Sequence, residues 1–393
     1  MTSLSAVLLG LLVQVGFTLL TSGLVRKKNA AHLVMLTFSA YVFAFLAYYA
    51  VGHALQSGLH GFLLRGIPID SRLMLDIALM LVAGYVLVGA VCERITFGAF
   101  VLCELFLGAV LYPVCAQWVW GGGWLSHIGS TLRLGRGFVD FGGSSVVHSL
   151  GGFCAMALAL ILGPRLGKYG RDGQPRPFLA HNIIFVTVGT LVVLFGWTGL
   201  MAASTPLADV AAHVAINVNI AAVSGAAAAM SFWYFSYGKP DVSMACNGLL
   251  AGLVGISASA PFVGPAASLI IGAAAGVLAC MGVLFNERTL KIDDPCGSIA
   301  VHGYCGWWGA VALGVFANGS TQGVTGLIHG DALQAAAQLV GATMCALFAF
   351  GLTYVVFAVV NASRRMRVDP EIEAEGLDLT QFGMLAYPDD EGV

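Results

Sequence analysis

The chain has 393 residues, of which 58% are hydrophobic and only 10% are charged, and its formal net charge is −2. A water-soluble domain carries about 25% charged residues. This composition therefore excludes a soluble protein, which would lack the polar surface to stay dissolved, and predicts an all-α integral membrane protein. The near-neutral charge and the lack of a basic tract argue against nucleic acid as a partner.

The first apolar run, residues 4–24, is long enough for a membrane helix but could also be a signal peptide. It has no basic segment in front of it, and it ends at Arg26-Lys27-Lys28 instead of a small-residue cleavage site. We therefore expect a retained helix in the lipid bilayer. The nine cysteines farther along are spread singly without a CxxC motif. They read as apolar packing residues, and we expect no metal and no cofactor.

Eleven apolar runs come close to the roughly 20 residues that a spanning helix needs. Turn-like segments such as GPRLGKYGRDGQPRP separate them, and a polar tail follows Arg364. We expect a membrane domain over residues 1–363 and a cytoplasmic tail over residues 364–393. The expected helices lie at about 4–24, 31–54, 74–92, 97–117, 144–163, 181–203, 210–235, 244–262, 266–285, 299–317 and 334–360.

The positions of the basic residues predict the orientation of these helices. With the N-terminus outside, fourteen of the 18 Lys and Arg residues fall in cytoplasmic loops or the tail. The other four fall in outer loops and are Arg65, Arg72, Arg133 and Arg136. Because cytoplasmic loops are enriched in Lys and Arg, this distribution predicts the N-terminus out and the C-terminus in.

One motif occurs twice. DFGGSSVVH at 140–148 and DPCGSIAVH at 294–302 both read D-x-x-G-S-x-x-V-H. Five expected crossings separate the copies, so they run in opposite directions, as in an inverted repeat of five plus five helices with an eleventh added. Each histidine lies about 12 Å along a helix from its aspartate, and the hydrocarbon core is about 30 Å thick. We therefore expect His148 and His302 to approach each other near the middle.

A pair of intramembrane histidines can line a pore or a buried site, or can be two hydrogen-bonded core residues. The symmetric repeat favours the functional reading, because ionisable groups in a membrane usually face a cavity or a polar partner. Asp140 and Asp294 each precede a helix and can be ordinary N-caps. At the outer mouth, a buried Asp140 would also favour a nearby cation. Two histidines alone are too few ligands for a metal.

Several motifs together resemble the ammonium transporter (Amt/Mep/Rh) family, and bacterial Amt proteins most of all. The resemblance runs from residue 5 to about residue 387 and rests on motif order and spacing. The motifs are GLVRKKN at 23–29, WVWGGGW at 118–124, DFGGSSVVH at 140–148, HN at 181–182, FGW at 195–197, GKP at 238–240 and IDDPCGSIAVHG at 292–303.

The resemblance implies a homotrimer in which each subunit has its own hydrophobic pore. It implies that His148 and His302 are twin pore histidines beside Trp197, and that Trp120, Asp140 and Ser204 recruit ammonium. An aromatic face attracts a cation, and a hydroxyl oxygen accepts a hydrogen bond from an ammonium N–H. Without the resemblance, Trp120 would read as an interface aromatic and Ser204 as a helix serine bonded to its own backbone.

The sequence departs from the family pattern at the pore entrance and in the fourth helix. The family places stacked phenylalanines at positions that fall here on Leu75, Leu79 and Leu200, and leucine has no π face for a cation. Glu104 is an intramembrane carboxylate. It is either functional or a paired or protonated group at a subunit contact. In the outer loop, Arg133 and Arg136 could oppose cation recruitment or pair with Asp140.

The tail EGLDLTQFGMLAY (375–387) resembles the family only around EGLD and the final Ala-Tyr. In bacterial members this tail takes part in subunit coupling and in docking of PII-type signal proteins. The alternative here is a solvated acidic end.

The first hypothesis is a transporter in the cell (inner) membrane that binds ammonium outside, deprotonates it and conducts ammonia. The alternatives are an ammonium sensor with little flux and an electroneutral channel for ammonia or carbon dioxide. An enzyme is the least supported reading, because the sequence offers no acid–base constellation besides the histidines.

Overall fold

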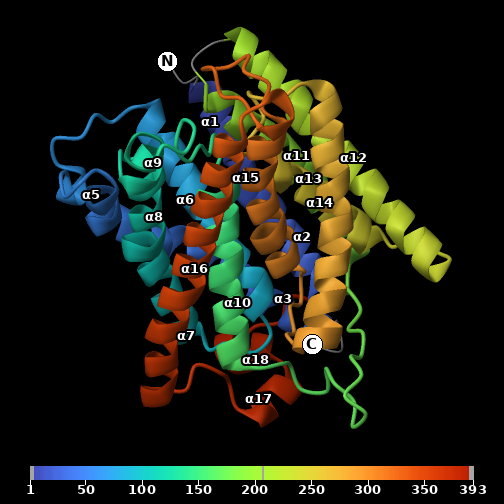
Figure 1. Cartoon of the computed structure of the whole chain (residues 1–393). Helices are drawn as coiled ribbons and strands as arrows, with labels where there is room; N and C mark the ends of the chain where they lie inside the picture. The colour runs from blue at the N-terminus through green and yellow to red at the C-terminus, as the bar shows by residue number, and fades with distance from the viewer. Residues whose placement is uncertain (1–3, 206–207, 389–393) are drawn as a thin grey trace.

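The structure is a computed structural model that describes residues 4–205 and 208–388. In these ranges every regular element is a helix, and extended backbone pairs only in isolated bridges. The helices form one elongated bundle in which most run along the long axis (Figure 1). The all-α prediction therefore holds for the described residues.

Ten helical segments of the described chain are long and apolar enough to cross a membrane. Several of them contain short 3₁₀ or π-helical turns, labelled η. The segments are α1 (Leu4–Gly10) with α2 (Leu12–Leu24); η1 (Lys27–Asn29), α3 (Ala30–Ser39), η2 (Ala40–Ala44), α4 (Phe45–Ala47), η3 (Tyr48–Gly52) and α5 (His53–Gln56); α6 (Ser71–Val91); α7 (Phe97–Phe106), η5 (Leu107–Leu111), α8 (Tyr112–Val119) and α9 (Trp124–Leu132); η6 (Ser144–Ser149) and α10 (Leu150–Leu162); α11 (Ile183–Ala203); α12 (Ala208–Tyr237); α14 (Pro265–Phe285) and η7 (Asn286–Leu290); η8 (Ile299–Tyr304) and α15 (Cys305–Phe316); and α16 (Ala332–Ser363).

The remaining expected run, 244–262, contains a shorter apolar helix, α13 (Val242–Ile256), of 15 residues. Two segments expected to be irregular are partly helical. The outer loop carries α9, and the tail carries α17 (Pro370–Glu375) and α18 (Leu377–Phe382). The two short turns η4 (Phe62–Leu64) and η9 (Leu327–His329) complete the described elements.

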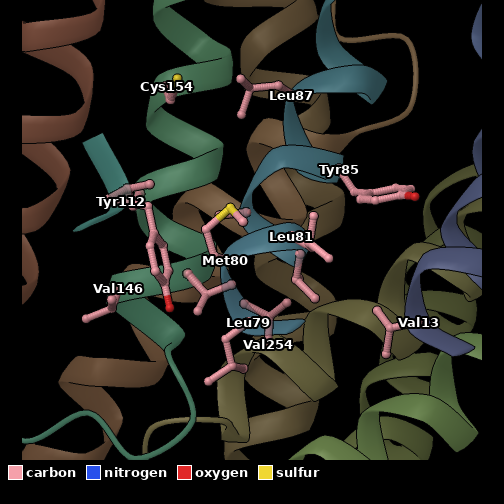
Figure 2. Close-up of a cluster of buried hydrophobic side chains, with 14 of the residues drawn as sticks. Val13, Leu79, Met80, Leu81, Tyr85, Leu87, Tyr112, Val146, Cys154 and Val254 are labelled. Atoms are coloured by element: carbon pink, nitrogen blue, oxygen red, sulfur yellow. The ribbon is translucent and has the colours of Figure 1, made fainter. Parts of the chain in front are cut away.

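The central helix of the bundle is α6. Nearly all of its residues from Ile77 onward are buried, which is typical of a helix that is apolar on every side. Figure 2 shows Leu79, Met80, Leu81, Tyr85 and Leu87 of α6 among side chains from neighbouring elements, which are Val13, Tyr112, Val146, Cys154 and Val254. The outer helices α11, α12 and α16 instead expose large apolar side chains, as a multi-pass membrane protein does toward lipid.

All nine cysteines are free thiols inside the fold, where they pack as small apolar side chains.

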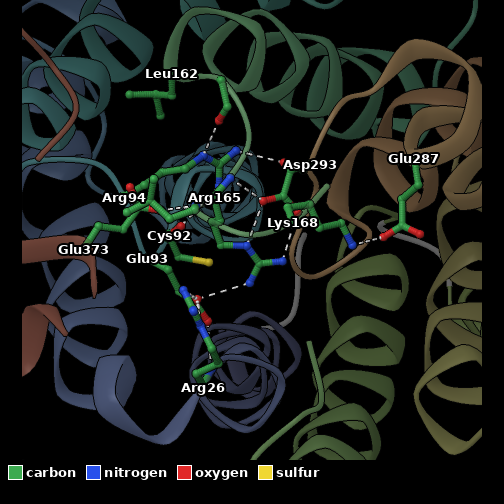
Figure 3. Close-up of polar contacts among 12 residues, drawn as sticks. Arg26, Cys92, Glu93, Arg94, Leu162, Arg165, Lys168, Glu287, Asp293 and Glu373 are labelled. Carbon is green, nitrogen blue, oxygen red and sulfur yellow. Dashed lines mark hydrogen bonds and ion pairs between the residues drawn. The ribbon is translucent and has the colours of Figure 1, made fainter. Parts of the chain in front are cut away.

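A network of charged side chains closes the end of the bundle that carries α17 (Figures 1 and 3). Glu93 follows α6 and accepts a 2.6 Å hydrogen bond from Nε of Arg26, and Arg165 lies 3.2 Å from the same carboxylate. Arg165 also binds Asp293 at 2.8 Å, and Arg94 donates to the Asp293 carbonyl. These basic residues all belong to the set expected on the cytoplasmic side. We call this the charged end.

The pKa values in this network follow from burial and pairing. Burial alone would raise the pKa of Glu93, but the guanidinium groups of Arg165 and Arg26 lower it below its ordinary value. Burial likewise opposes ionisation of Asp293, and its hydrogen bonds and charge pairing with Arg165 hold the pKa of that carboxyl well below the usual range. Both carboxylates are therefore ionised and paired at neutral pH.

Part of the described tail packs against this end. The acidic residues Asp389, Asp390 and Glu391, which suit a solvated end, lie outside the described residues. Glu373 is buried and binds Arg367 at 2.7 Å. The buried Asp378 accepts backbone N–H bonds from Ala31 and His32 at the start of α3. It thereby satisfies donors that a helix N-terminus leaves free.

Candidate functional site

The two copies of the repeated motif have the same local structure. Asp140 accepts N–H bonds from Gly143, Ser145 and Val146 at 2.8–3.0 Å. Asp294 accepts them from Ser298 and Ile299 at 3.0 and 2.7 Å. In both copies the carboxylate caps a π-helical turn that carries the histidine, η6 in one and η8 in the other. Both aspartates therefore cap these turns with their side chains, while Gly143 and Ser298 occupy the N-cap positions themselves.

Burial governs the protonation of these caps. Burial raises the pKa of Asp140 above its ordinary value. Hydrogen bonds from nearby backbone N–H groups oppose this shift but do not cancel it. Burial raises the pKa of Asp294 to about 7, again opposed by its backbone N–H bonds.

Glycines allow the helix that carries His148 (η6 with α10) and the helix that carries His302 (η8 with α15), here called the motif helices, to cross in close contact. A Cβ atom on Gly152, four residues after His148, would overlap the backbone of Gly303. A Cβ atom on Gly306, four residues after His302, would overlap the backbone of η6. Only glycine allows so close an approach of two backbones. The crossing brings the two histidine turns together.

The two histidines meet at this crossing as the sequence predicts. Nδ1 of His148 lies 3.3 Å from Nδ1 of His302, and the two residues are 2% and 3% exposed. The His148 ring stacks on Trp197 with centroids 4.6 Å apart and planes 17° apart, while Phe17 lies 5.7 Å from His302. Trp197 is itself held by a 3.1 Å bond from its Nε1 to the hydroxyl of Ser257. Both imidazoles are thus fixed inside the bundle.

A cavity of about 450 Å³ opens at the end of α6 that is opposite the charged end. We call it the vestibule cavity. It brings together four of the predicted site residues, Leu75, Leu79, Trp120 and Ser204. The other residues that line it are Gln56, Asp70, Ser71, Arg72, Asp76 and Phe141.

The remaining recruitment and gate residues lie around this cavity. Trp120 donates a hydrogen bond from Nε1 to the backbone carbonyl oxygen of Asp140 at 2.6 Å, which positions the indole ring. The Asp140 carboxylate instead accepts N–H bonds from η6. Ser204 donates to the carbonyl of Leu200, which is the helix-serine bond considered above. Leu200 itself is buried against Gly10 of α1. Asp140 and Leu200 are not among the described residues that line the cavity.

Two spaces lie on the other side of the histidine pair. A chamber of about 10 Å³ touches His302, Ser298 and Asn247, which is room for about one water-sized molecule. A recess of about 300 Å³ at the charged end shares Asn247 and Cys296 with this chamber. We call these the His302 chamber and the charged-end recess. The histidine pair therefore lies between hollow spaces on its two sides.

Glu104 lies away from these spaces. It is fully buried, and neither carboxylate oxygen has a hydrogen-bond partner among the described residues. One oxygen lies beside Gly84 of α6. Since the side chain is enclosed within the chain, it does not reach a surface where a second subunit could contact it. Arg133 and Arg136 do not belong to the described cavity lining, and Asp140 uses its oxygens on backbone N–H groups instead.

Sequence reasoning missed Asp76, Phe141, Asn247 and Ser298. Asp76 did carry a signal, since it is an acidic residue within an expected membrane helix, as Glu104 is. Phe141 and Ser298 belong to the repeated motif, but the motif did not indicate that they line a cavity, and the position of Asn247 depends on how the helices pack.

The fold and the site define a polytopic helical membrane protein with a buried histidine pair between hollow spaces. The model of the Ammonium Transporter Family matches residues 1–387. Ammonium transporter Amt2 of Archaeoglobus fulgidus is 39% identical over 98% of this chain and 87% of its own length, and the ammonium transporter of Bacillus subtilis is 33% identical over 95% and 94%. The chain therefore belongs to the ammonium transporter family, which consists of transporters and not of enzymes.

Solved structures agree with this assignment. A structure titled Sensor Amt Protein superposes with a TM-score of 0.90 at 31% identity, covering 96% of each chain. Mep2 of Candida albicans superposes with a TM-score of 0.84 at 27% identity, covering 94% of this chain and 85% of its own.

Proposed function

We propose that this protein moves ammonium inward across the cell (inner) membrane by binding it at the vestibule cavity, deprotonating it and conducting ammonia past the histidine pair. The observation that carries the proposal is the 3.3 Å contact of His148 with His302, placed between the vestibule cavity and the charged-end recess. Family membership supplies ammonium as the substrate class.

Recruitment uses the polar and aromatic lining of the vestibule cavity. The Trp120 ring attracts the cation, and its bond to the Asp140 carbonyl holds it in place. The Ser204 hydroxyl donates a hydrogen bond to the carbonyl oxygen of Leu200, and its own oxygen keeps lone pairs that can accept an ammonium N–H. Potassium is similar in size and has no N–H to offer, so the hydroxyl contributes selectivity.

Beyond the cavity ammonium cannot keep its proton, so the proton passes to water in the cavity and crosses separately from ammonia, which gives the transport its net charge. Leu75 and Leu79 present aliphatic surface where α6 enters the core, and a bare cation there costs far more free energy than neutral ammonia. The imidazoles then offer ammonia hydrogen bonds in place of those it made in the vestibule cavity. In their Nδ1–Nδ1 contact one ring donates and the other accepts, so the pair can guide ammonia and also relay a proton.

We infer the membrane topology from the same features. The short helix α13 counts as an eleventh crossing, which completes two inverted sets of five helices and one added helix. The basic residues of the charged end support a cytoplasmic location for that end, with the N-terminus outside. Residues 1–363 form the membrane domain, and residues 364–393 form the cytoplasmic tail.

We also infer a homotrimer, as the family resemblance implies, with one pore in each subunit. The tail is the surface that a PII-type signal protein would contact, since α17 and α18 lie on the cytoplasmic side of this topology.

Two alternatives each rest on one observation. A sensor with little flux is favoured by the likeness to the structure titled Sensor Amt Protein and by leucine at the gate positions Leu75, Leu79 and Leu200. An electroneutral gas channel is favoured by the burial of the histidine pair, since an apolar path suits ammonia or carbon dioxide.

The test is electrical. Liposomes with purified protein on a solid-supported membrane receive an ammonium pulse, with potassium as the control cation. We expect a saturable ammonium current that is absent in His148→Ala and His302→Ala. Ammonium binding without current would overturn electrogenic transport. A pH-sensitive dye inside the liposomes would then distinguish a gas channel, which alkalinises the lumen, from a sensor, which leaves it unchanged.

A further inference from the structure

An acidic side chain reaches the vestibule cavity from the helix that carries the gate positions. Asp76 lies on α6 directly after Leu75 and three residues before Leu79, and all three line the cavity with Trp120 and Ser204. The Asp76 side chain is half-buried, whereas the neighbouring leucines are buried. A carboxylate in this position is partly shielded from water, so its charge is screened less than on an exposed surface.

The other carboxylates near the cavity are already occupied. Asp70 is the N-cap of α6 and accepts N–H bonds from Arg72 and Leu73, both at 3.0 Å. Both carboxylate oxygens of Asp140 accept hydrogen bonds from backbone N–H groups, which belong to Gly143 just before η6 and to Ser145 and Val146 within it. Asp76 lies in the second turn of α6, past the first turn with its free backbone N–H groups. In the second turn the backbone N–H groups bond to carbonyl oxygens of the helix itself. The Asp76 carboxylate is therefore the one placed to receive a cation from the cavity.

The remaining lining of the cavity suits a small cation. Arg72 is the basic side chain of the described lining, and it is exposed at the rim. Gln56 contributes an amide whose oxygen accepts a 2.7 Å bond from the hydroxyl of Tyr48. The cavity therefore contains a carboxylate, an indole face and a serine hydroxyl around one space.

We propose that the Asp76 carboxylate forms a monovalent-cation subsite in the vestibule cavity. At this subsite Asp76, Trp120 and Ser204 together hold ammonium on the cavity side of Leu79. Leucines at the gate positions lack the π face that would attract a cation, and Asp76 supplies that attraction by charge. This proposal rests on the proposed function, and it adds Asp76 to the residues that bind ammonium.

The Coulomb attraction of a carboxylate depends on charge and distance, so Asp76 attracts potassium as well as ammonium. Asp76 therefore raises the occupancy of the subsite for both cations. Potassium should compete for the subsite, while the hydroxyl of Ser204 and the deprotonation step still exclude it from the pore. A site built only on aromatic faces and hydroxyls would show weaker competition of this kind.

The experiment measures the ammonium concentration at half-maximal current for the wild type, Asp76→Asn, Asp76→Glu and the matched control Asp331→Asn. Asp331 is the N-cap of α16 and is not among the described residues that line the cavity. Asparagine is as good an N-cap as aspartate, so Asp331→Asn removes a carboxylate charge away from the cavity and keeps the fold. We expect Asp76→Asn to raise the half-saturating concentration about tenfold or more, the scale of losing one charged partner. Asp76→Glu and Asp331→Asn should stay within about twofold of the wild type.

Potassium competition gives a second, mutation-free readout. Added potassium chloride should raise the half-saturating ammonium concentration of the wild type and leave the maximal current unchanged. Choline chloride at equal ionic strength controls for screening. Asp76→Asn should lose most of this competition.

The failures can be told apart. A wild type without ammonium current or ammonium binding overturns the proposed function. A wild type with a normal saturable current overturns this inference alone if Asp76→Asn keeps its half-saturating concentration. Lack of potassium competition in the wild type also overturns the inference, even where Asp76→Asn does not fold.

Discussion

The Nδ1 atoms of His148 and His302 lie 3.3 Å apart, although 154 residues separate the two histidines in the chain. Two like nitrogens at this distance share one hydrogen bond, so the pair holds one N–H between its rings. The contact depends on the crossing of the two motif helices, which Gly152 and Gly306 make possible. The contact of the two imidazoles therefore depends on how these helices pack.

Replacement of either histidine by asparagine should reduce the ammonium current by about 100-fold, the typical contribution of a positioned proton-transfer group. Asparagine keeps hydrogen-bonding capacity but does not titrate near neutral pH. The current is measured on solid-supported membranes. His329→Asn, at an exposed position, serves as the control. Currents of wild-type size in both pair variants would contradict a role for the imidazoles in proton handling.

Gly152→Ala should destabilise the protein, because the added Cβ overlaps the backbone of Gly303. Overpacking of this kind costs about 1–3 kcal/mol. The melting temperature in detergent reports the loss. Gly351→Ala is the matched control, since a Cβ at Gly351 meets nothing within 4 Å and alanine favours the helix. Equal melting temperatures for the two variants would show that the crossing tolerates a methyl group.

Glu93→Gln should lower the free energy of unfolding by about 1.5–3 kcal/mol, because it removes the charged partner of Arg26 and one of the two carboxylates that pair with Arg165. Asp369→Asn breaks the exposed pair with Arg365 and should cost about 0–1 kcal/mol. Since the pKa of Glu93 is lowered from its ordinary 4.5, its stabilisation is present above pH 4.5 and is lost as the pH falls through the folded-state pKa. Melting temperatures across this range should therefore converge for wild type and Glu93→Gln in acid.

Asp378→Ala should release the tail from α3, because it removes the acceptor for the N–H groups of Ala31 and His32. Loss of a cap costs about 1 kcal/mol, which is roughly a fivefold change in the open population. Limited proteolysis of the tail should speed up by that factor. Glu371→Ala, an exposed change on α17, should leave the rate unchanged. An unchanged rate for Asp378→Ala would mean that other contacts hold the tail.

Glu104→Met should stabilise the protein by about 1–3 kcal/mol, because it removes a buried carboxyl that has no hydrogen-bond partner among the described residues. Methionine has a similar volume and adapts to irregular packing. Melting temperature and ammonium current are measured together. We expect a higher melting temperature with an unchanged current. Loss of current in the stabilised variant would instead assign Glu104 a part in transport.

Most of the membrane helices could be predicted from the sequence, because a spanning helix is a local property of about 20 apolar residues. The repeated motif likewise predicted the meeting of His148 and His302. The roles of single polar residues were harder to predict. Asp140 could be a cap or a cation site from its sequence context, and its hydrogen bonds show the cap.

The sequence by itself determined the membrane class, the family motifs and the histidine pair, since these depend on composition, local hydrophobicity and spacing. Only the tertiary structure decided which side chains share a space. It placed Asp76 beside Trp120 and Ser204, enclosed Glu104, and folded the tail onto α3. Apart from the histidine pair, which the repeat relates by symmetry, contacts between residues far apart in the chain depend on how helices pack, and no local pattern encodes them.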